Sequence, residues 1–166
     1  MTKIILQKIF EDHWPELKIG VKTMKQFWVE VSKISLKKIN PVILSNKYYE
    51  AIWIDKKLLN IIKKLIKNYK IVMIANDSDD IYLSKIQKFK LERIFDKLYC
   101  SSQLGISKPN SRIFKYVLDD LKIKPREMLF IDNQDNNIES AKKLNINTIL
   151  FSTIDKLMIN LPEFFV

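Results

Sequence analysis

From residue 55 to the end of the chain, short apolar runs alternate with segments of helical spacing. Four of the runs are long enough for buried strands and too short for helices; they are residues 71–75, 98–100, 128–131 and 146–151. Between the runs, apolar residues recur every three or four positions, as they do on one face of a helix. This alternation predicts an α/β fold, in which the strands of a Rossmann-like parallel sheet are connected by right-handed helical crossovers.

Residues 1–54 follow a different pattern, because the apolar residues there have mostly helical spacing. Gly20 separates two predicted helices, and Thr23 with Gln26 forms a possible capping box at the start of the second. Pro41 is expected to end this second helix, since a proline excludes the residue before it from helical geometry. Residues 42–53 have no clear period and leave a loop or a short helix open. We expect this N-terminal part to lie outside the sheet.

The composition is that of an ordinary globular protein, with 47% apolar and 29% charged residues in a chain of 166. This length predicts one domain, or one domain with a small insert. The sequence has no apolar run of about eighteen residues and no N-terminal pattern of a secretory signal, so we predict no membrane partner. Cys100 is the single cysteine and cannot form an internal disulfide, which favours a reducing cytoplasmic location.

The net charge of +10 invites a nucleic-acid partner, but the arrangement of the charges argues against one. Nearly all the basic residues are lysines, and they are spread along every segment. The arginines are Arg93, Arg112 and Arg126 alone. Because no basic face interleaved with aromatic residues is present, we predict that the chain does not bind nucleic acid.

Three polar clusters fall just beyond predicted strands. Asn76 and Asp77 follow the run 71–75, Lys108 lies in the loop after the second run, and residues 132–137 follow the third. In open parallel sheets, ligands bind beyond the carboxyl ends of the strands. We therefore expect the chemistry of the chain to lie near Asp132.

Two of these segments resemble the haloacid dehalogenase (HAD) superfamily of phosphatases and dehalogenases. They are residues 98–114 (LYCSSQLGISKPNSRIF) and residues 129–141 (LFIDNQDNNIESA). The resemblance extends from about residue 10 to the end of the chain and is closest to small sugar-phosphate phosphatases of the glucose-1-phosphate type. It implies hydrolysis of a small phosphorylated metabolite with Mg²⁺ as the cofactor, since phosphoryl transfer needs a nucleophile, a hard cation and a cationic clamp.

The resemblance also implies a role for each polar cluster. Lys108 would be the catalytic clamp that steadies the charge of the phosphoryl group, with Asn76 and Asp77 also at the phosphate. The positions that match the metal motif are Asp132, Asn133 and Asn137. Plainer readings stay open, because Lys108 precedes a proline that can start a helix, and Asn133 and Asn137 suit loop and N-cap positions.

Several positions depart from the family pattern. The first motif, a strand running into Asp-x-Asp, has no match before residue 55, and residues 18–31 resemble the helical cap that follows it. We therefore expect residues 1–54 to be a partial helical cap and residues 55–166 a core without its first strand. Ala75 takes the position of a Ser or Thr that holds the phosphoryl group, and Asn133 that of a magnesium-binding Asp. These departures predict a truncated, catalytically impaired pseudoenzyme.

Two other functions stay open on the sequence. The chain is an active hydrolase if an upstream segment or a second, complementing chain supplies the missing motif. It is a protein-binding module, or part of a homo-oligomer, if an open sheet edge binds a partner. In the family the missing strand lies between the strands ending at Ala75 and Ile131, so these two strands would pair with each other or leave backbone groups unpaired.

Overall fold

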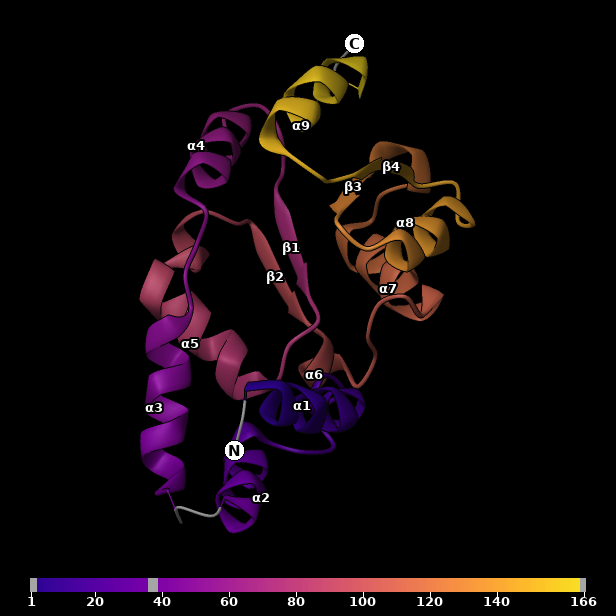
Figure 1. The fold of residues 1–166 in the computed structure, drawn as a ribbon. Coiled ribbons are helices and arrows are strands. Elements are labelled where there is room, and N and C mark those ends of the chain that lie inside the picture. Colours follow the sequence, from indigo (N-terminus) through magenta and orange to yellow (C-terminus); the bar gives the residue numbers. More distant parts are fainter. Residues whose placement is uncertain (1–2, 36–38, 165–166) are drawn as a thin grey trace. The chain divides into compact units, whose positions relative to one another are not determined.

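The structure is a computed structural model that describes residues 3–35 and 39–164. Figure 1 shows its helices and strands in chain order. The chain forms two compact units, Met1–Gly105 and Ile106–Val166. None of the helices in the described ranges is long and apolar enough to cross a membrane.

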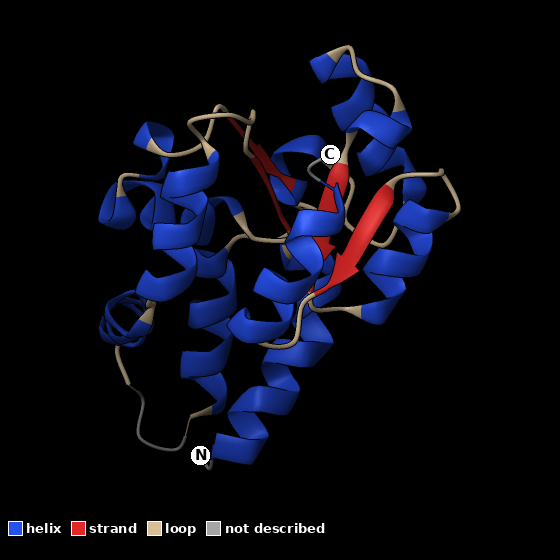
Figure 2. Cartoon of the chain, turned by 90° about the horizontal axis from the view of Figure 1, so that it is seen from above, coloured by secondary structure: helices blue, strands red, loops and turns tan. Residues whose placement is uncertain are grey.

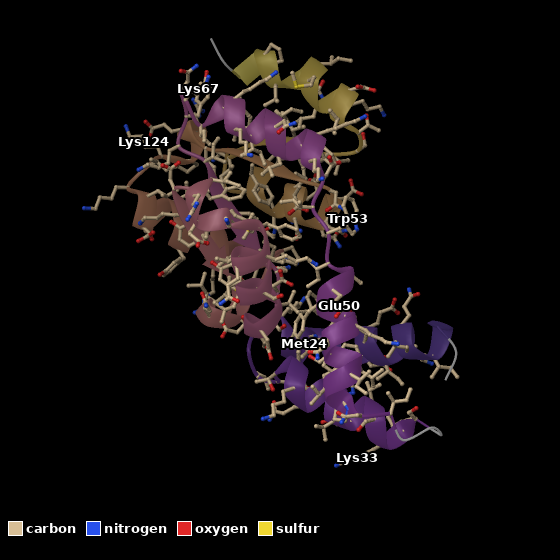
Figure 3. All side chains as sticks on the ribbon, turned by 90° about the vertical axis from the view of Figure 1, so that its left-hand side faces the viewer. Met24, Lys33, Glu50, Trp53, Lys67 and Lys124 are labelled. Atoms are coloured by element: carbon tan, nitrogen blue, oxygen red, sulfur yellow. The ribbon has the colours of Figure 1, made fainter. Side chains whose placement is uncertain are left out.

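The first unit begins with three helices, α1 (Lys3–Leu17), α2 (Met24–Ile34) and α3 (Pro41–Ala51). They pack around a core of fully buried or nearly buried side chains: Leu17, Met24, Phe27, Trp28, Val31 and Ile81. Most aromatic residues of these helices pack ring against ring, as Phe27 does against Trp28 at 4.9 Å between centroids. Figure 3 labels the buried Met24 and also Trp53, whose residue surface is 77% exposed. The aromatic residues of the helices therefore mostly form the core of this unit.

Side-chain caps define the starts of these helices. The predicted capping box is confirmed, because Thr23 accepts from the amide of Gln26 while the Gln26 side chain accepts from the amide of Thr23. The prediction that Pro41 ends the second helix is wrong. Helix α2 ends at Ile34, and Pro41 lies in the first turn of α3 with Asn40 as its N-cap. Proline suits that position because the first turn of a helix leaves its amide groups unpaired.

The rest of the first unit contains one pair of described strands. Asp55 caps α4 by accepting from the amides of Lys57 and Leu58. The strands run parallel, with Val72 opposite Lys97 and Ala75 opposite Cys100. The elements are α4 (Lys56–Leu65), β1 (Val72–Ala75), α5 (Asp79–Phe89), η1 (Leu91–Arg93), β2 (Lys97–Cys100) and α6 (Ser101–Leu104).

The second unit repeats the alternation of strand and helix around another parallel pair. Leu129 lies opposite Asn147, and Asp132 lies opposite Leu150. Phe130 packs edge-on against Phe114 with 4.9 Å between the ring centroids. The elements are α7 (Ser111–Leu121), η2 (Pro125–Glu127), β3 (Leu129–Asp132), α8 (Asp135–Lys142), β4 (Asn147–Leu150), α9 (Ile154–Asn160) and η3 (Leu161–Phe164).

The predicted fold class is confirmed. All four predicted strands form, and both pairs are parallel, with helices between successive strands (Figure 2). The segment 42–53, left open between loop and short helix, is mostly the helix α3. The predicted division at residue 54 into cap and core stays a prediction, as does the pairing of the strands that end at Ala75 and Ile131.

Candidate functional site

The polar residues at the end of β3 form the best-defined candidate site in the second unit. Asp132 is the last residue of β3, and the turn after it leads directly into α8, which carries Asn137 in its first turn. Lys108 belongs to the loop before α7. Burial of Phe130 and Ile138 fixes the strand and the helix, because each side chain is less than a tenth exposed. The sequence thus brings Asp132 and Asn137 together through one short strand-to-helix turn.

Both carboxylate oxygens of Asp132 accept hydrogen bonds from the protein. Lys108 Nζ lies 2.7 Å from Oδ2, and the side chains of this ion pair are only 10% and 8% exposed. Asn137 Nδ2 donates to Oδ1 at 3.0 Å, and the backbone amide of Gln134 donates to the same oxygen at 2.9 Å. Three of the predicted site residues therefore meet at one carboxylate.

The hydrogen bonds around Asp132 decide its charge. Burial alone would raise the pKa of this carboxyl, but the hydrogen bond and positive charge of Lys108 lower it, with smaller contributions from Asn137 and the Gln134 amide. The net shift of the Asp132 pKa is downward. Asp132 is therefore a stable anion whose charge is balanced inside the protein.

Sequence reasoning missed two contributors to this site. Phe130 lies two residues before Asp132 on the same strand, and the Lys108 ammonium lies 5.4 Å from the centroid of its ring. The two-residue period of a strand places the side chains of Phe130 and Asp132 on one face, so the sequence pattern could have predicted that Phe130 lies at the site. The amide of Gln134 contributes through its backbone, which no side-chain pattern reveals.

Asn133 is also a predicted residue of this site, but none of the described hydrogen bonds connects it to the residues around Asp132. Its side chain is exposed, and the donors described at Asp132 do not include it. Its assignment as a metal ligand stays a prediction.

The predicted phosphate-binding residues of the first unit have a different setting. Asp77 is buried, and its Oδ2 lies 2.6 Å from Lys85 Nζ of α5. The backbone amide of Asp77 donates to Ser101 Oγ at 3.1 Å. These contacts connect Asp77 to α5 and to Ser101, the first residue of α6, and its assignment to the phosphate site stays a prediction. Asn76 directly follows β1, and its role stays a prediction.

The residues of the second-unit site do not by themselves fit a magnesium ion. Mg²⁺ prefers near-octahedral coordination by oxygen atoms, usually with one or two carboxylates. Within the described ranges, no group of three or more His, Cys, Asp or Glu side chains is placed to hold a metal ion. Protein donors already bind both oxygens of Asp132, and these described donors are Lys108, Asn137 and the Gln134 amide.

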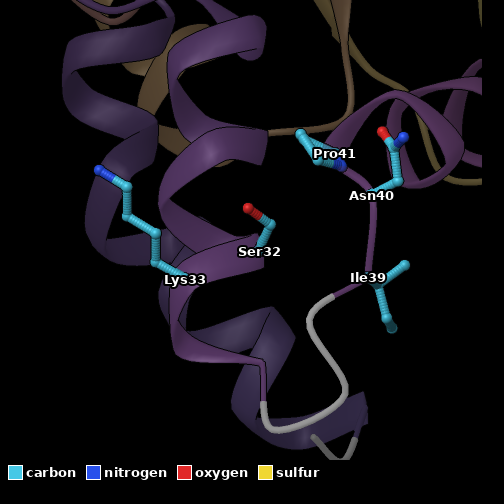
Figure 4. Close-up of a pocket in the computed structure, with 5 residues that line it drawn as sticks. All are labelled: Ser32, Lys33, Ile39, Asn40 and Pro41. Atoms are coloured by element: carbon cyan, nitrogen blue, oxygen red, sulfur yellow. The ribbon is translucent and has the colours of Figure 1, made fainter.

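A separate pocket lies at the junction of α2 and α3 in the first unit (Figure 4). The described residues that line it are Ser32, Lys33, Ile39, Asn40 and Pro41. None of them belongs to the predicted site. We assign it no function.

The chain belongs to the haloacid dehalogenase-like hydrolase family. The family profile with that description matches residues 18–151, which is most of the chain. The resemblance predicted from residues 98–114 and 129–141 is therefore confirmed.

Known proteins similar to this chain include both phosphatases and other enzymes. A HAD family enzyme from Bacteroides thetaiotaomicron, solved with magnesium and inorganic phosphate, superposes with a TM-score of 0.77 at 26% identity, covering 93% of this chain and 86% of that one. D-ribitol-5-phosphate phosphatase from the same organism is 32% identical over 102 residues, 57% of this chain and 49% of the enzyme.

Two further relatives are much longer proteins, and only a part of each matches this chain. Drimenol cyclase from Aspergillus calidoustus is 29% identical over 70% of this chain and 23% of its own length. Bifunctional epoxide hydrolase 2 from Rattus norvegicus is 39% identical over 45% of this chain and 14% of its own length. The chain thus spans less than two thirds of these curated relatives, so activities of the whole proteins do not transfer to it directly.

Proposed function

We propose that this chain is a phosphatase-type domain of the HAD family whose own residues do not complete a catalytic centre. The observation that carries this proposal is the state of Asp132, the carboxylate expected to bind the metal. Lys108, Asn137 and the Gln134 amide take up both of its oxygens. Two residues inside the chain support the same conclusion, because Ala75 has no hydroxyl for a phosphoryl oxygen and Asn133 has no charge for a divalent ion.

The residues that remain are suited to bind an anionic group rather than to break a bond. The ammonium of Lys108 can balance the negative charge of a phosphoryl group. Asn137 and the Gln134 amide hold the Asp132 carboxylate in a fixed orientation. In this proposal Mg²⁺ is the cofactor of relatives and not of this chain alone, and the ligand class is a small phosphomonoester. We also propose a cytoplasmic location, which the single buried Cys100 supports.

A second candidate is an active hydrolase in which another segment or a second chain supplies the nucleophile. The preserved contact between Lys108 and Asp132 favours it, because a clamp lysine and a motif acid lie together at a strand end. The greater length of the curated relatives is also compatible with this candidate. In this case the complementing chain, or a second copy of this one, is an obligate partner.

Phosphate release by the purified chain tests the proposal. D-ribitol 5-phosphate and para-nitrophenyl phosphate are incubated with the chain and MgCl₂, with Lys108→Ala and Asp132→Ala as matched variants. We expect the three proteins to release phosphate at the same background rate. A magnesium-dependent rate that both substitutions abolish would refute the proposal and favour the second candidate.

Reintroducing the two family side chains provides a complementary test. Ala75→Ser restores a hydroxyl and Asn133→Asp restores a carboxylate. We expect the double variant to remain inactive on its own, because neither change supplies a nucleophile. Turnover by the double variant but not by the original chain would show that these two residues alone account for the impairment.

A further inference from the structure

The ammonium group of Lys108 occupies a small cation site in the second unit. The carboxylate of Asp132 lies on one side, 2.7 Å away, and the ring of Phe130 has its centroid 5.4 Å from Nζ. A carboxylate and an aromatic face are the two protein groups that attract a desolvated cation most strongly. The side chain of Lys108 is only 10% exposed, so these groups replace much of its water.

The surroundings of the site hold these groups in place. Phe114 packs edge-on against Phe130 and fixes the plane of its ring. Asn137 is 6% exposed and donates to the carboxylate oxygen that Lys108 does not contact. The amide of Gln134 donates to that same oxygen. Asp132 is therefore oriented before any ligand arrives, with Lys108 on one oxygen and neutral donors on the other.

A buried carboxylate requires a compensating positive charge, which can come from a metal ion or from a side chain. In this unit the charge is already present on Lys108. A divalent ion at Asp132 would have to displace the ammonium or share its oxygen, and the described hydrogen-bond partners of Asp132 include no second carboxylate that could also bind the ion.

We propose that Lys108 is the built-in cation of Asp132, so that the second unit is complete and stable without a metal ion. The ammonium takes the role toward this carboxylate that a divalent ion would otherwise fill. This inference rests on the proposed function and deepens it, because it names the group that takes the place of the metal at Asp132.

The first test measures thermal unfolding of the intact chain with and without MgCl₂. We expect millimolar Mg²⁺ to shift the melting temperature no more than NaCl of the same ionic strength does. A stabilisation specific to Mg²⁺ that disappears in Asp132→Asn would overturn the proposal. Hydrolysis is not measured in this experiment, so failure of this inference is distinguishable from failure of the proposed function, which phosphate release tests.

The second test removes the ammonium. Lys108→Ala should lower the melting temperature by roughly 5–10 °C, because a buried carboxylate loses its counter-ion. Propylammonium chloride should restore part of this loss in Lys108→Ala and have no such effect on the original chain. Propanol, which has a similar shape and no charge, is the control and should not rescue. Rescue by propanol to the same extent, or melting of Lys108→Ala at the original temperature, would contradict the proposal.

If Lys108→Ala does not fold, a variant that keeps the volume of the lysine side chain tests the same proposal. Lys108→Met keeps most of the side chain and removes its charge. We expect Lys108→Met/Asp132→Asn to melt at a higher temperature than Lys108→Met, because the neutral amide needs no cation. If the double variant instead loses as much stability, relative to the original chain, as Lys108→Met and Asp132→Asn lose together, the two residues are not coupled and the proposal fails.

Discussion

Asp77 Oδ2 and Lys85 Nζ form an ion pair of 2.6 Å that connects the end of β1 to helix α5. The Asp77 side chain is 5% exposed and that of Lys85 is 35% exposed, so the pair is shielded mainly on the carboxylate side. The neighbouring Ser101 Oγ accepts from the Asp77 amide and donates to the carbonyl of Lys18 at 2.5 Å. Asp77 therefore lies in a network that holds three separate chain segments of the first unit together.

Replacing Lys85 should weaken the first unit. Lys85→Met keeps the aliphatic part of the side chain and removes the ammonium that balances the buried Asp77. We expect the free energy of unfolding in urea to fall by about 1–2 kcal/mol, less than for a fully buried pair because Lys85 is partly exposed to solvent. Lys64→Met, at an exposed position of α4, is the control for the loss of one charge and should change stability by less than about 0.5 kcal/mol. Equal losses in the two variants would show that the ion pair contributes nothing.

The two glycines of the chain offer a matched pair for a test of close packing. Both have positive φ, +79° at Gly20 and +65° at Gly105. A Cβ at Gly20 would lie 2.6 Å from the carbonyl oxygen of Ser102, whereas a Cβ at Gly105 would meet no atom within 4 Å. Alanine at either position strains the backbone, but only at Gly20 does it also force two segments apart.

We expect Gly105→Ala to lower the free energy of unfolding by roughly 1 kcal/mol, from the left-handed backbone alone. Gly20→Ala should lower the free energy of unfolding by about 1–3 kcal/mol more than Gly105→Ala does, because the backbone at Ser102 has to move. Thermal and urea unfolding of the two variants measure the difference directly. Similar stabilities would mean that the turn after α1 does not pack tightly against the turn after β2.

The lowered pKa of Asp132 predicts a pH dependence with a definite sign. Burial opposes ionisation, but the hydrogen bond and charge of Lys108 outweigh it and hold the pKa below its usual value. The unfolded chain therefore binds the proton first as the pH falls. The stabilisation by ionised Asp132 is complete above the unfolded-state pKa of about 3.9 and is lost as the pH falls through the lower pKa of the folded state.

Urea unfolding of the original chain and of Asp132→Asn between about pH 7 and pH 3 measures this effect. The stability difference between the two proteins should stay constant down to about pH 4 and shrink below it. Asp135→Asn, at an exposed position in the first turn of α8, is the control for the removed charge. A difference that grows as the pH falls would mean that the charge of Asp132 is not stabilising.

Much of the fold could be predicted from the sequence because its signals are local. The run 128–131 is apolar and short, and it forms β3 at Leu129–Asp132. Thr23 and Gln26 lie three residues apart, and they form the predicted capping box. In each case the side chains that decide the structure are neighbours along the chain, so the pattern of residue types is sufficient.

Other features depend on contacts that the pattern of residue types does not contain. Pro41 suits both the end of one helix and the start of another, and the residues after it decide for the start of α3. The partner of Asp77 is Lys85, one of many lysines of similar appearance in the sequence. Asn137 suits an N-cap by its residue type, but Gln134 is the N-cap of α8, and Asn137 donates from inside the helix to Asp132.

The central claim is that this chain, a member of the HAD-like hydrolase family, does not complete a catalytic magnesium site with its own residues. Calorimetric titration of the purified chain with MgCl₂ in the presence of inorganic phosphate tests it most directly, since a similar enzyme from Bacteroides thetaiotaomicron was solved with both. We predict no saturable binding heat for Mg²⁺ at millimolar concentrations, with or without inorganic phosphate. Saturable binding of one magnesium ion per chain, lost in Asp132→Asn, would contradict the claim.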